Sequence, residues 1–381
     1  MSVPAPSACE DPVVAIFRSP IFNASETFIQ RHATSLTRFR PVIVGLEGKG
    51  NILPELTDRI LLPAGRIERI GFSLFGRAAP IAARLRGFAP KLVHAHFATD
   101  GVAALPLAKA LGVPLVTTLH GYDVSRSAAR MLLSGRWSWT RYALLRRRLL
   151  RRGRLFLAVS EALRRRAVAD GYPADRTLTH YLGVALAPLE AEPPEPGLIL
   201  HVGRLVEKKG TAVLFDAVAR LDAARLVIIG DGPLRASLER QAQTLGLGER
   251  LRFLGALPPA EVAAWMRRAW ALAVPSVTAR DGDAEGLPTV IKEAAALALP
   301  AVGTDHAGIP EAIVENETGF IVPERDAEAL AARLGALLAS PDLRRAMGTA
   351  ARRLAERKFD AARQVARLEA LYDGILGQIR P

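Results

Sequence analysis

Short runs of Val, Ile and Leu alternate with helix-period segments along almost the whole chain, and this alternation restricts the possible folds more than any other feature. In the first half, strands are expected at Val13–Phe17, Val42–Leu46, Leu92–Phe97, Leu115–Leu119 and Leu155–Val159. Helical patterns lie between them, for example at Glu26–Leu36 and Val102–Leu111. Such alternation predicts a parallel sheet covered by helices on both faces.

The pattern restarts in the second half, after a stretch that can continue neither a strand nor a helix. This stretch, Ala187–Gly197, reads APLEAEPPEPG and contains four prolines in eleven residues. Further strands are expected at Leu198–Val202, Arg225–Ile229, Leu251–Leu254, Ala271–Val274, Ala301–Val302 and Phe320–Val322. Helices are expected at Thr211–Leu221, Leu234–Leu245, Ala260–Ala269, Thr289–Leu297 and Ala327–Ala339.

The length of 381 residues suits two domains, each with its own core. We expect a first domain over residues 1–186, a linker over 187–197 and a second domain over 198–358. The tail, residues 359–381, is expected to be a helix that packs back on the first domain. Two such α/β domains would enclose a cleft lined by the ends of both sheets, where ligands of open α/β sheets bind.

Cysteine content and the N-terminal residues bear on the compartment. The single cysteine, Cys9, excludes a disulfide within the chain and a site with four thiolate ligands. The first residues, MSVPAPSACEDP, lack the charged start and apolar core of a secretory signal, and no stretch of about 18 apolar residues is present. These features predict a cytoplasmic protein that is soluble or peripheral on the membrane.

Positive charge is concentrated in one segment. Of the formal net charge of +13, the segment Arg126–Arg166 carries +12, with 13 arginines and one acidic residue, Glu161. Trp137, Trp139 and Tyr142 lie among these arginines. The mixture favours an interfacial element on an anionic membrane, and a solvated helical face is the structural alternative. Nucleic acid is a weaker candidate partner, because no nucleic-acid-binding fold accompanies the segment.

The segment Asp281–Gly303 contains the most informative group of candidate functional residues. It reads DGDAEGLPTVIKEAAALALPAVG, where Glu285 precedes a Gly-Leu-Pro turn and Glu293 follows eight residues later. A helix that starts near Pro288 or Thr289 would offer unpaired N–H groups and its positive dipole end to an anion such as a diphosphate. Two carboxylates beside a phosphate would repel it unless they hold hydroxyl groups. The hydroxyls of a sugar and a ribose meet this requirement.

Two further loops are expected at the same cleft. The first, GRLVEKKG at residues 203–210, follows an expected strand and brings Arg204 and Lys209. A forked guanidinium and a point charge suit a diphosphate leaving group, whose developing charge they would stabilise. The second is Gly230–Pro233, a tight loop after the next strand. In the first half, His120 ends a strand, and Gly121 beside it allows a close backbone approach.

The order of these motifs resembles a known family. The motifs G-R-L-x-x-K-K-G, G-D-G-P, E-G-L-P-x-x-x-x-E-A and G-I-P-E are similar to those of retaining glycosyltransferases of the GT-B fold, in glycosyltransferase family 4 (group 1). The resemblance covers nearly the whole chain and is strongest from His201 to Pro323. It implies two Rossmann-like αβα domains that face a central cleft, the first binding the acceptor and the second the nucleotide sugar.

The resemblance also implies roles for individual residues. The implied catalytic residues are His120, Glu285, Arg204 and Lys209. The implied donor-binding residues are Arg204, Lys209, Gly286, Leu287, Pro288 and Glu293. Arg204 and Lys209 would hold the diphosphate, Glu285 the transferred sugar and Glu293 the ribose, while His120 would contact the sugar near its reacting carbon. The family retains the anomeric configuration by same-face attack, which needs no dedicated protein base.

The loop Arg18–Phe28 departs from the family pattern, since many relatives carry a Gly-Gly pair there. In this loop, the sequence of Ser25–Phe28 resembles that of a subgroup of the family whose members build exopolysaccharides of the colanic-acid type. We therefore expect transfer from a UDP-, GDP- or dTDP-sugar to a saccharide on a polyprenyl diphosphate, at the inner face of the cytoplasmic membrane. A nucleotide-sugar hydrolase or epimerase on the same fold, and a non-catalytic nucleotide-sugar-binding module, are the alternatives.

No metal or other cofactor is expected. Asp281 and Asp283 resemble the Asp-x-Asp metal motif of a different transferase fold, but they lie in a polar loop beside Glu285. His94 and His96 would share one face of a strand, but no third ligand is evident near them in the sequence. A structural or cleft-wall role is therefore favoured for both histidines. Ser160 is expected to cap the following helix.

Overall fold

The computed structural model describes residues 11–21, 27–48, 52–121, 124, 128–186, 188–189 and 194–378. Several residues on which sequence predictions rest lie outside these ranges: Cys9, Ser25, Glu26, Arg126 and much of the stretch Ala187–Gly197. Among the helices of the described residues, none combines the length and the apolar character that a membrane crossing requires.

A seven-stranded sheet forms the core of the first half. Its strands are β1 (Val13–Phe17), β2 (Arg40–Val44), β3 (Ile60–Leu61), β4 (Pro90–His96), β5 (Leu115–Leu119), β6 (Leu155–Ala158) and β7 (Thr177–Thr179). They lie in the order β3-β2-β1-β4-β5-β6-β7, and all neighbours are parallel. The central strands β1 and β5 are buried throughout, as their uninterrupted apolar sequences predict.

Helices cover both faces of this sheet. The helical elements of the first half are α1 (Thr27–Ser35), η1 (Pro54–Arg59), α2 (Arg66–Phe75), α3 (Ala79–Arg86), α4 (Ala98–Leu111), α6 (Ala128–Leu132), α7 (Trp137–Arg152), α8 (Glu161–Ala169) and η2 (Ala174–Arg176). Alternate residues of β1 point to opposite faces: Ala15 joins a core with α3, α4, α7 and α8, whereas Val14 and Ile16 join a core with α1.

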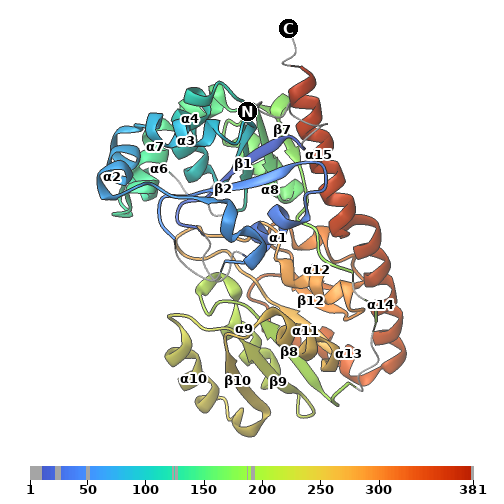
Figure 1. The fold of residues 1–381 in the computed structure, drawn as a ribbon. Coiled ribbons are helices and arrows are strands. Elements are labelled where there is room, and N and C mark those ends of the chain that lie inside the picture. The colour runs from blue at the N-terminus through green and yellow to red at the C-terminus, as the bar shows by residue number, and fades with distance from the viewer. Residues whose placement is uncertain are drawn as a thin grey trace.

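A six-stranded sheet organises the second half in the same way. Its strands are β8 (Leu198–Val202), β9 (Arg225–Ile229), β10 (Leu251–Gly255), β11 (Ala271–Val274), β12 (Ala301–Thr304) and β13 (Gly319–Val322). Their order is β10-β9-β8-β11-β12-β13, again with every neighbouring pair parallel. Both sheets thus confirm the predicted parallel α/β architecture, and Figure 1 shows the two layered units one above the other.

The helices of the second half also lie on both faces of their sheet. They are η3 (Glu207–Lys209), α9 (Thr211–Val218), α10 (Arg235–Thr244), η4 (Gly248–Arg250), α11 (Pro259–Arg268), α12 (Thr289–Ala296), η5 (Ile309–Glu311), α13 (Ala327–Ala339) and α14 (Pro341–Leu354). One face packs on α9, α10 and α13, and the other on α11 and α12.

The C-terminal helix returns to the first domain. A π-helical turn, Ala355–Phe359, joins α14 to α15 (Ala361–Gly377), and Figure 1 shows these helices running along one side of both units. At the crossing, Val184 N–H donates to Phe359 O at 2.8 Å. The Glu369 carboxylate on α15 then accepts from the backbone N–H groups of Thr37 and Arg38, both at 2.7 Å. Helix α15 is therefore part of the first domain's core.

The arginine-rich segment corrects one sequence prediction. Its central part is the helix α7, but Trp139 and Tyr142 are buried at 4% and 0% exposure and belong to the core. Trp137 remains half exposed. The spacing of Trp139, Tyr142 and Leu149 places them on one helix face, which α7 turns toward α4. The aromatic residues expected at a membrane interface are thus mostly core residues.

Candidate functional site

The start of helix α12 forms one wall of the site. The helix begins at Thr289, and Pro288 at its N-cap (φ −58°, ψ 123°) makes no side-chain capping hydrogen bond. Leu287 and Pro288 are buried, so the Gly-Leu-Pro turn holds the approach to the helix in place. Pro288 therefore supplies no side-chain acceptor to the first N–H groups of α12, and a helix start without such a cap suits an anion.

Glu285 and Lys209 meet beside this helix start. Lys209 ends the short turn η3, and its Nζ lies 3.1 Å from Oε1 of Glu285. Lys208 Nζ lies 3.8 Å from the same oxygen and 3.3 Å from Asp283 Oδ1. Burial alone would raise the pKa of Glu285, but the charges of Lys209 and Lys208 outweigh it and lower that pKa. Glu285 is therefore an ionised carboxylate, with only 11% of its side chain exposed.

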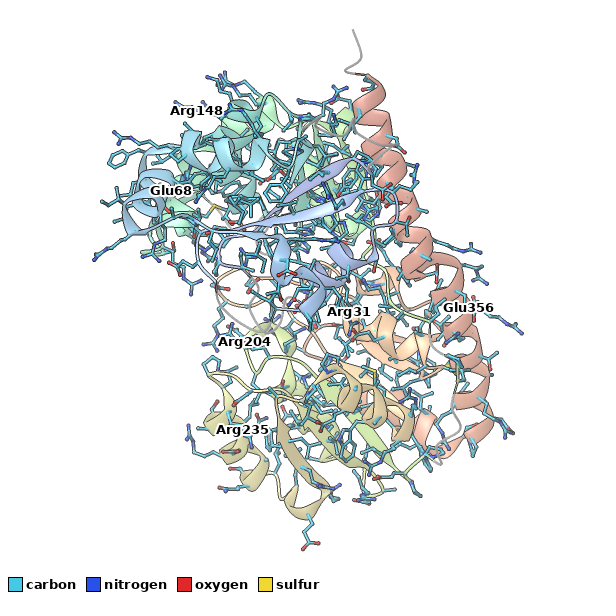
Figure 2. The ribbon with its side chains drawn as sticks, in the orientation of Figure 1. Arg31, Glu68, Arg148, Arg204, Arg235 and Glu356 are labelled. Carbon is cyan, nitrogen blue, oxygen red and sulfur yellow. The ribbon has the colours of Figure 1, made fainter. Side chains whose placement is uncertain are left out.

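Arg204 occupies the loop between β8 and η3. Its side chain is exposed and has no ion-pair partner among the described residues. Figure 2 places it at the end of the second domain that faces the first. The loop after β9 supports this backbone, because Leu205 N–H donates to Asp231 O at 3.0 Å. The two loops predicted at one sheet edge thus lie together, with Arg204 open to solvent.

Glu293 lies one turn into α12 and faces the first domain. Its Oε1 lies 3.5 Å from Nη1 of Arg31 on α1, and about a third of its side chain is exposed. Lys292 beside it is fully buried, and its Nζ donates to Leu182 O at 2.7 Å. Burial lowers the pKa of Lys292 to about 7. Helix α12 therefore contacts the first domain through two adjacent residues, Lys292 and Glu293.

The backbones of the two domains touch at His120 and Glu285. A Cβ atom on Gly121 would lie 2.8 Å from Gly286 N, and one on Gly286 would lie 2.4 Å from His120 O. Larger residues would force the two segments apart. Ser160 Oγ also donates to Gly286 O at 3.0 Å. These contacts bring His120 of the first half and the Glu285 turn of the second half to one place, where the two domains meet.

His120 lies in an aromatic setting at the end of β5. Its ring centroid is 4.4 Å from that of Phe97 and 5.0 Å from that of Phe28, and its Nε2 lies 3.1 Å from Nδ1 of His96. Burial, with the nearby charge of Arg18, holds the pKa of His120 well below its usual value. The ring is therefore a neutral imidazole with one donor and one acceptor nitrogen.

A carboxylate from the second domain caps a helix of the first. Ser160 caps α8 as predicted, since its Oγ accepts from Leu163 N–H at 3.1 Å. The Glu311 carboxylate accepts from the N–H groups of Glu161 and Ala162, each at 2.8 Å, and from Tyr181 OH at 2.8 Å. An acidic group at a helix start is electrostatically favourable. This contact holds the domains together beside the site.

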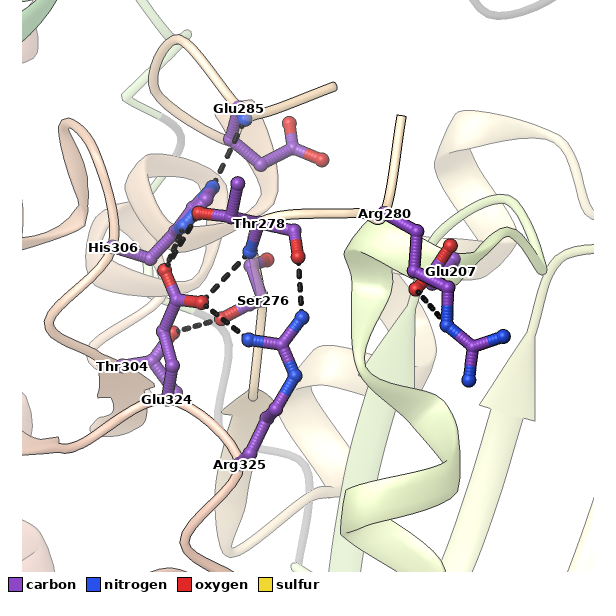
Figure 3. A network of polar contacts seen from close by, with 9 residues as sticks. All are labelled: Glu207, Ser276, Thr278, Arg280, Glu285, Thr304, His306, Glu324 and Arg325. Atoms are coloured by element: carbon purple, nitrogen blue, oxygen red, sulfur yellow. Dashed lines mark hydrogen bonds and ion pairs between the residues drawn. The ribbon is translucent and has the colours of Figure 1, made fainter. Parts of the chain in front are cut away.

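The sequence did not single out His306 and Glu324, which hold the Glu285 turn (Figure 3). Glu285 N–H donates to Nε2 of His306 at 3.1 Å, and Nδ1 of His306 donates to Glu324 Oε1 at 2.6 Å. Glu324 also accepts from Thr278 N–H at 2.8 Å. His306 and Glu324 follow β12 and β13 closely, so their position at the carboxyl ends of strands was an available signal.

The histidines of β4 have a neighbour that the sequence did not reveal. A third histidine does lie near His94 and His96: the potential ligand atoms of His32, His94 and His96 are within 4.8 Å of one another. His94 is fully buried, and its two ring nitrogens contact Tyr372 OH at 2.5 Å and Thr118 Oγ1 at 2.7 Å. His94 therefore has a structural role in the core.

Two parallel α/β domains that meet at the loops following their strands define the class of GT-B proteins. A solved structure of this kind is HepE of Anabaena in complex with UDP and glucose, which has a TM-score of 0.77 and 19% identity over 94% of this chain and 99% of HepE. The fold predicted from the sequence is thereby confirmed.

Sequence comparison defines the family. The model of glycosyl transferases group 1 matches residues 188–354, and that of glycosyltransferase family 4 matches residues 25–187. The amylovoran biosynthesis glycosyltransferase AmsK of Erwinia amylovora is 32% identical, over 74% of this chain and 70% of AmsK. WcaL of Escherichia coli K12, described as a glycosyltransferase of colanic acid biosynthesis, is 36% identical over 64% of this chain and 60% of WcaL. The chain belongs to the family 4 (group 1) glycosyltransferases, and it covers less than two thirds of WcaL.

Proposed function

We propose that this protein is a retaining glycosyltransferase that moves a sugar from a nucleotide-diphosphate sugar to a saccharide acceptor in cell-surface polysaccharide assembly. One observation carries the proposal: Lys209, Glu285 and the uncapped start of α12 converge where the backbone of His120 touches the second domain. This arrangement offers cations and N–H donors for a diphosphate, and an ionised carboxylate for sugar hydroxyls. Similarity to AmsK and WcaL supports the polysaccharide setting.

In the proposed donor complex, the diphosphate replaces Glu285 as the partner of Lys209. Arg204, which is exposed at the cleft, would fold onto the same phosphates. The released Glu285 carboxylate would accept hydrogen bonds from the sugar, and Glu293 would exchange Arg31 for the ribose hydroxyls. The ion pairs of the ligand-free site thus keep its charges balanced until the donor arrives.

The proposed reaction exchanges one bond at the anomeric carbon. The bond from this carbon to the phosphate oxygen breaks, and the acceptor oxygen bonds to the same face of the sugar. The acceptor proton passes to the departing phosphate oxygen, so charge and atoms balance without a protein base. Lys209, Arg204 and the N–H groups of α12 would stabilise the negative charge that develops on the diphosphate.

Nucleotide binding is expected to raise the melting temperature. A ligand at about 100 times its Kd stabilises the folded state by about 2.7 kcal/mol, which corresponds to roughly 5 °C or more for a chain of this size. A thermal-shift screen with UDP, GDP, dTDP, ADP and their common sugars should show this shift for one nucleotide family. The shift should disappear in Lys209→Ala and persist in Lys109→Ala, which removes an exposed lysine from α4.

The outcomes of this screen separate the proposal from its alternatives. A shift that survives in Lys209→Ala would show that the donor binds elsewhere, and no shift with any nucleotide would contradict a donor site. Free sugar or an epimer formed from the donor without acceptor would indicate a hydrolase or an epimerase. Binding without any turnover, unaffected by Glu285→Ala, would indicate a non-catalytic module.

We further propose that the acceptor is lipid-linked and that the protein lies on the inner face of the cytoplasmic membrane. Exposed apolar side chains on and near two helices of the first domain support this proposal. Helices α2 and α7 are joined there, since Trp137 Nε1 donates to Ser73 O at 3.0 Å. Around them Ile67, Phe75 and Leu133 are 90%, 70% and 86% exposed. We call these three residues, with Leu74, Trp137 and Leu144, the α2–α7 patch.

The arginines of α7 place positive charge beside the α2–α7 patch. Arg147, Arg148, Arg151 and Arg152 are all exposed. Apolar side chains within reach of several arginines suit the interface of a membrane with anionic lipids, where each cation contributes about 1 kcal/mol. Vesicles that contain phosphatidylglycerol would therefore bind this surface, and the binding would weaken with salt because the Debye length shortens.

Vesicle sedimentation can test the membrane proposal. Replacing Arg147, Arg148 and Arg151 together by Gln should weaken binding to phosphatidylglycerol vesicles about 100-fold, from about 1 kcal/mol per charge. The control replaces three exposed arginines of the C-terminal helical region, Arg353, Arg357 and Arg363, by Gln and should leave binding unchanged. Equal binding to phosphatidylcholine vesicles, or binding that is insensitive to salt, would contradict this role of the arginines.

A further inference from the structure

Three histidines form a hydrogen-bonded row that ends at the candidate site. Nδ1 of His32 on α1 lies 3.2 Å from Nε2 of His96, and Nδ1 of His96 lies 3.1 Å from Nε2 of His120. His96 is the last residue of β4, and His120 follows the neighbouring strand β5. We call His32, His96 and His120 the histidine row.

All three rings of the row are neutral near pH 7. Burial lowers the pKa of His32 to about 3 and holds the pKa values of His96 and His120 well below their usual value. A neutral imidazole has one N–H donor and one lone-pair acceptor. Two successive ring-to-ring hydrogen bonds can therefore form only if both run in the same direction, which leaves two possible arrangements.

The buried end of the row decides between these arrangements. Nε2 of His32 is buried and has no hydrogen-bond partner among the described residues. If the row ran from His120 to His32, this nitrogen would carry an N–H without an acceptor, and orphaned buried N–H groups are rare. If the row runs from His32 to His120, Nε2 of His32 carries only a lone pair. His32 Nδ1–H then donates to His96, and His96 Nδ1–H donates to Nε2 of His120.

We propose that His32 and His96 are positioning residues that fix His120 in the tautomer with its proton on Nδ1. With Nε2 occupied as an acceptor, His120 cannot take up a proton at that nitrogen. In this tautomer Nδ1 is protonated and Nε2 accepts a hydrogen bond, so His120 has no ring nitrogen available as a general base. This inference rests on the proposed transferase function for its kinetic consequence, but the tautomer itself is a property of the free protein.

A metal ion is the competing interpretation of the neighbouring cluster, His32, His94 and His96. Both ring nitrogens of His94 already contact hydroxyl groups, and the cluster contains no carboxylate. The positive charge of Arg18 acts on His96 and would oppose a buried dication. These observations favour the hydrogen-bonded row, and metal content becomes one outcome of the test.

The structure offers matched substitutions for the test. The amide nitrogen of Asn can replace the Nδ1 donor of a histidine, whereas that of Gln corresponds to Nε2. His96→Asn should therefore keep the hydrogen bond to His120, and His96→Gln should lose it. Tyr372→Phe removes a hydrogen bond from His94, which packs against His96 outside the row. The Tyr372→Phe variant therefore controls for a general loss of packing around His96.

Nitrogen-15 NMR of histidine-labelled protein is the first measurement, since it distinguishes the two neutral tautomers without substrate. We expect His120, identified by its loss in His120→Asn, to be protonated on Nδ1 in the wild type, in Tyr372→Phe and in His96→Asn. His96→Gln should show a mixture of tautomers. A wild-type His120 protonated on Nε2, or one equivalent of bound zinc that shifts the His32 and His96 signals, would overturn the proposal.

Kinetics then connect the tautomer to the reaction. We expect His96→Gln to lower kcat about 10-fold with a nearly unchanged donor KM, as for other groups that orient a functional histidine. His96→Asn and Tyr372→Phe should stay within about 2-fold of the wild type in kcat. The expected tautomers together with equal kcat in both His96 variants would refute the positioning role. No transfer by the wild type would count against the proposed function alone.

Discussion

Acidification from pH 7 to pH 5 is expected to unfold the protein, beginning in the first domain. Six of the seven histidines have pKa values that burial holds below the usual value: His32, His94, His96, His120, His180 and His201. Those of His180 and His201 fall to about 4. All except His201, which lies on β8, belong to the first domain.

The direction of this effect follows from proton binding. Each of these pKa values is lower in the folded than in the unfolded state, so the unfolded chain binds protons first as the pH falls below about 6.5. The free energy of unfolding therefore decreases as the pH falls from about 6.5 to the pKa values that the histidines have in the folded state. Proton binding linked to each histidine lowers the free energy of unfolding by at most about 2 kcal/mol between pH 7 and pH 5. The sum for six histidines approaches the total free energy of unfolding of a typical domain, about 5–15 kcal/mol.

Urea unfolding at pH 7.0, 6.0 and 5.5 measures this loss, and hydrogen exchange corrected for its intrinsic pH dependence locates it. The midpoint should fall steeply with pH, and peptides of β4 and β5 should lose protection before those of β9 and β11. His201→Asn removes the one such histidine of the second domain and should leave the order of unfolding unchanged. A constant midpoint between pH 7.0 and 5.5 would contradict the prediction.

Glu285→Ala is expected to lower kcat by about 100- to 1000-fold while changing the donor Kd little. The proposed hydrogen bonds from this carboxylate to the sugar strengthen as charge develops at the anomeric carbon, and groups of this kind contribute about 3–4 kcal/mol to the transition state. Initial rates with the donor identified by thermal shift, over a range of donor and acceptor concentrations, separate kcat from KM. Glu317→Ala, an exposed carboxylate of the same domain, is the control.

Lys209→Ala and Glu293→Ala are expected to differ from Glu285→Ala by weakening donor binding. Charge-assisted hydrogen bonds contribute about 1.5–3 kcal/mol, so the donor Kd should rise roughly 10- to 100-fold. Because Lys209 and Glu285 pair in the free protein, Lys209→Ala leaves a buried carboxylate with Lys208 at 3.8 Å. Melting temperatures of all variants are therefore needed as a folding control. Wild-type donor affinity in both Lys209→Ala and Glu293→Ala would refute the site assignment.

The local pattern of the sequence predicted most of the elements. Apolar runs such as Val13–Phe17 and Leu198–Val202 coincide with observed strands, because a buried parallel strand needs unbroken apolar residues. The strands β3 and β7 were missed, since two residues and Thr-Leu-Thr carry no such pattern. The aromatic residues of α7 were misplaced because composition was read without the helical period that turns Trp139 and Tyr142 inward.

The grouping of the candidate donor-site residues in the second domain was also predictable. Arg204, Lys209 and Glu285 follow strands or precede a helix within one domain, so the rule that loops meet at the carboxyl edge of a parallel sheet sufficed to group them. The network of His306 and Glu324 could have been predicted by applying the same rule to β12 and β13, which these residues follow. The family resemblance implied that His120 and Glu285 both act on the transferred sugar, whereas their backbone contact came from the structure, where two adjacent glycine-containing segments make it sterically possible.

The sequence by itself determined the α/β class and the family, and it led to the proposed donor-site residues, because these depend on local periodicity and short motifs. Only the tertiary structure brought His32, His96 and His120 into one row and His94 against Tyr372 of the last helix. The physical reason is strand order. The order β1-β4-β5 is set by crossover connections and by packing of the whole sheet, and α15 reaches the first domain only by crossing from the second. No local pattern encodes contacts of that range.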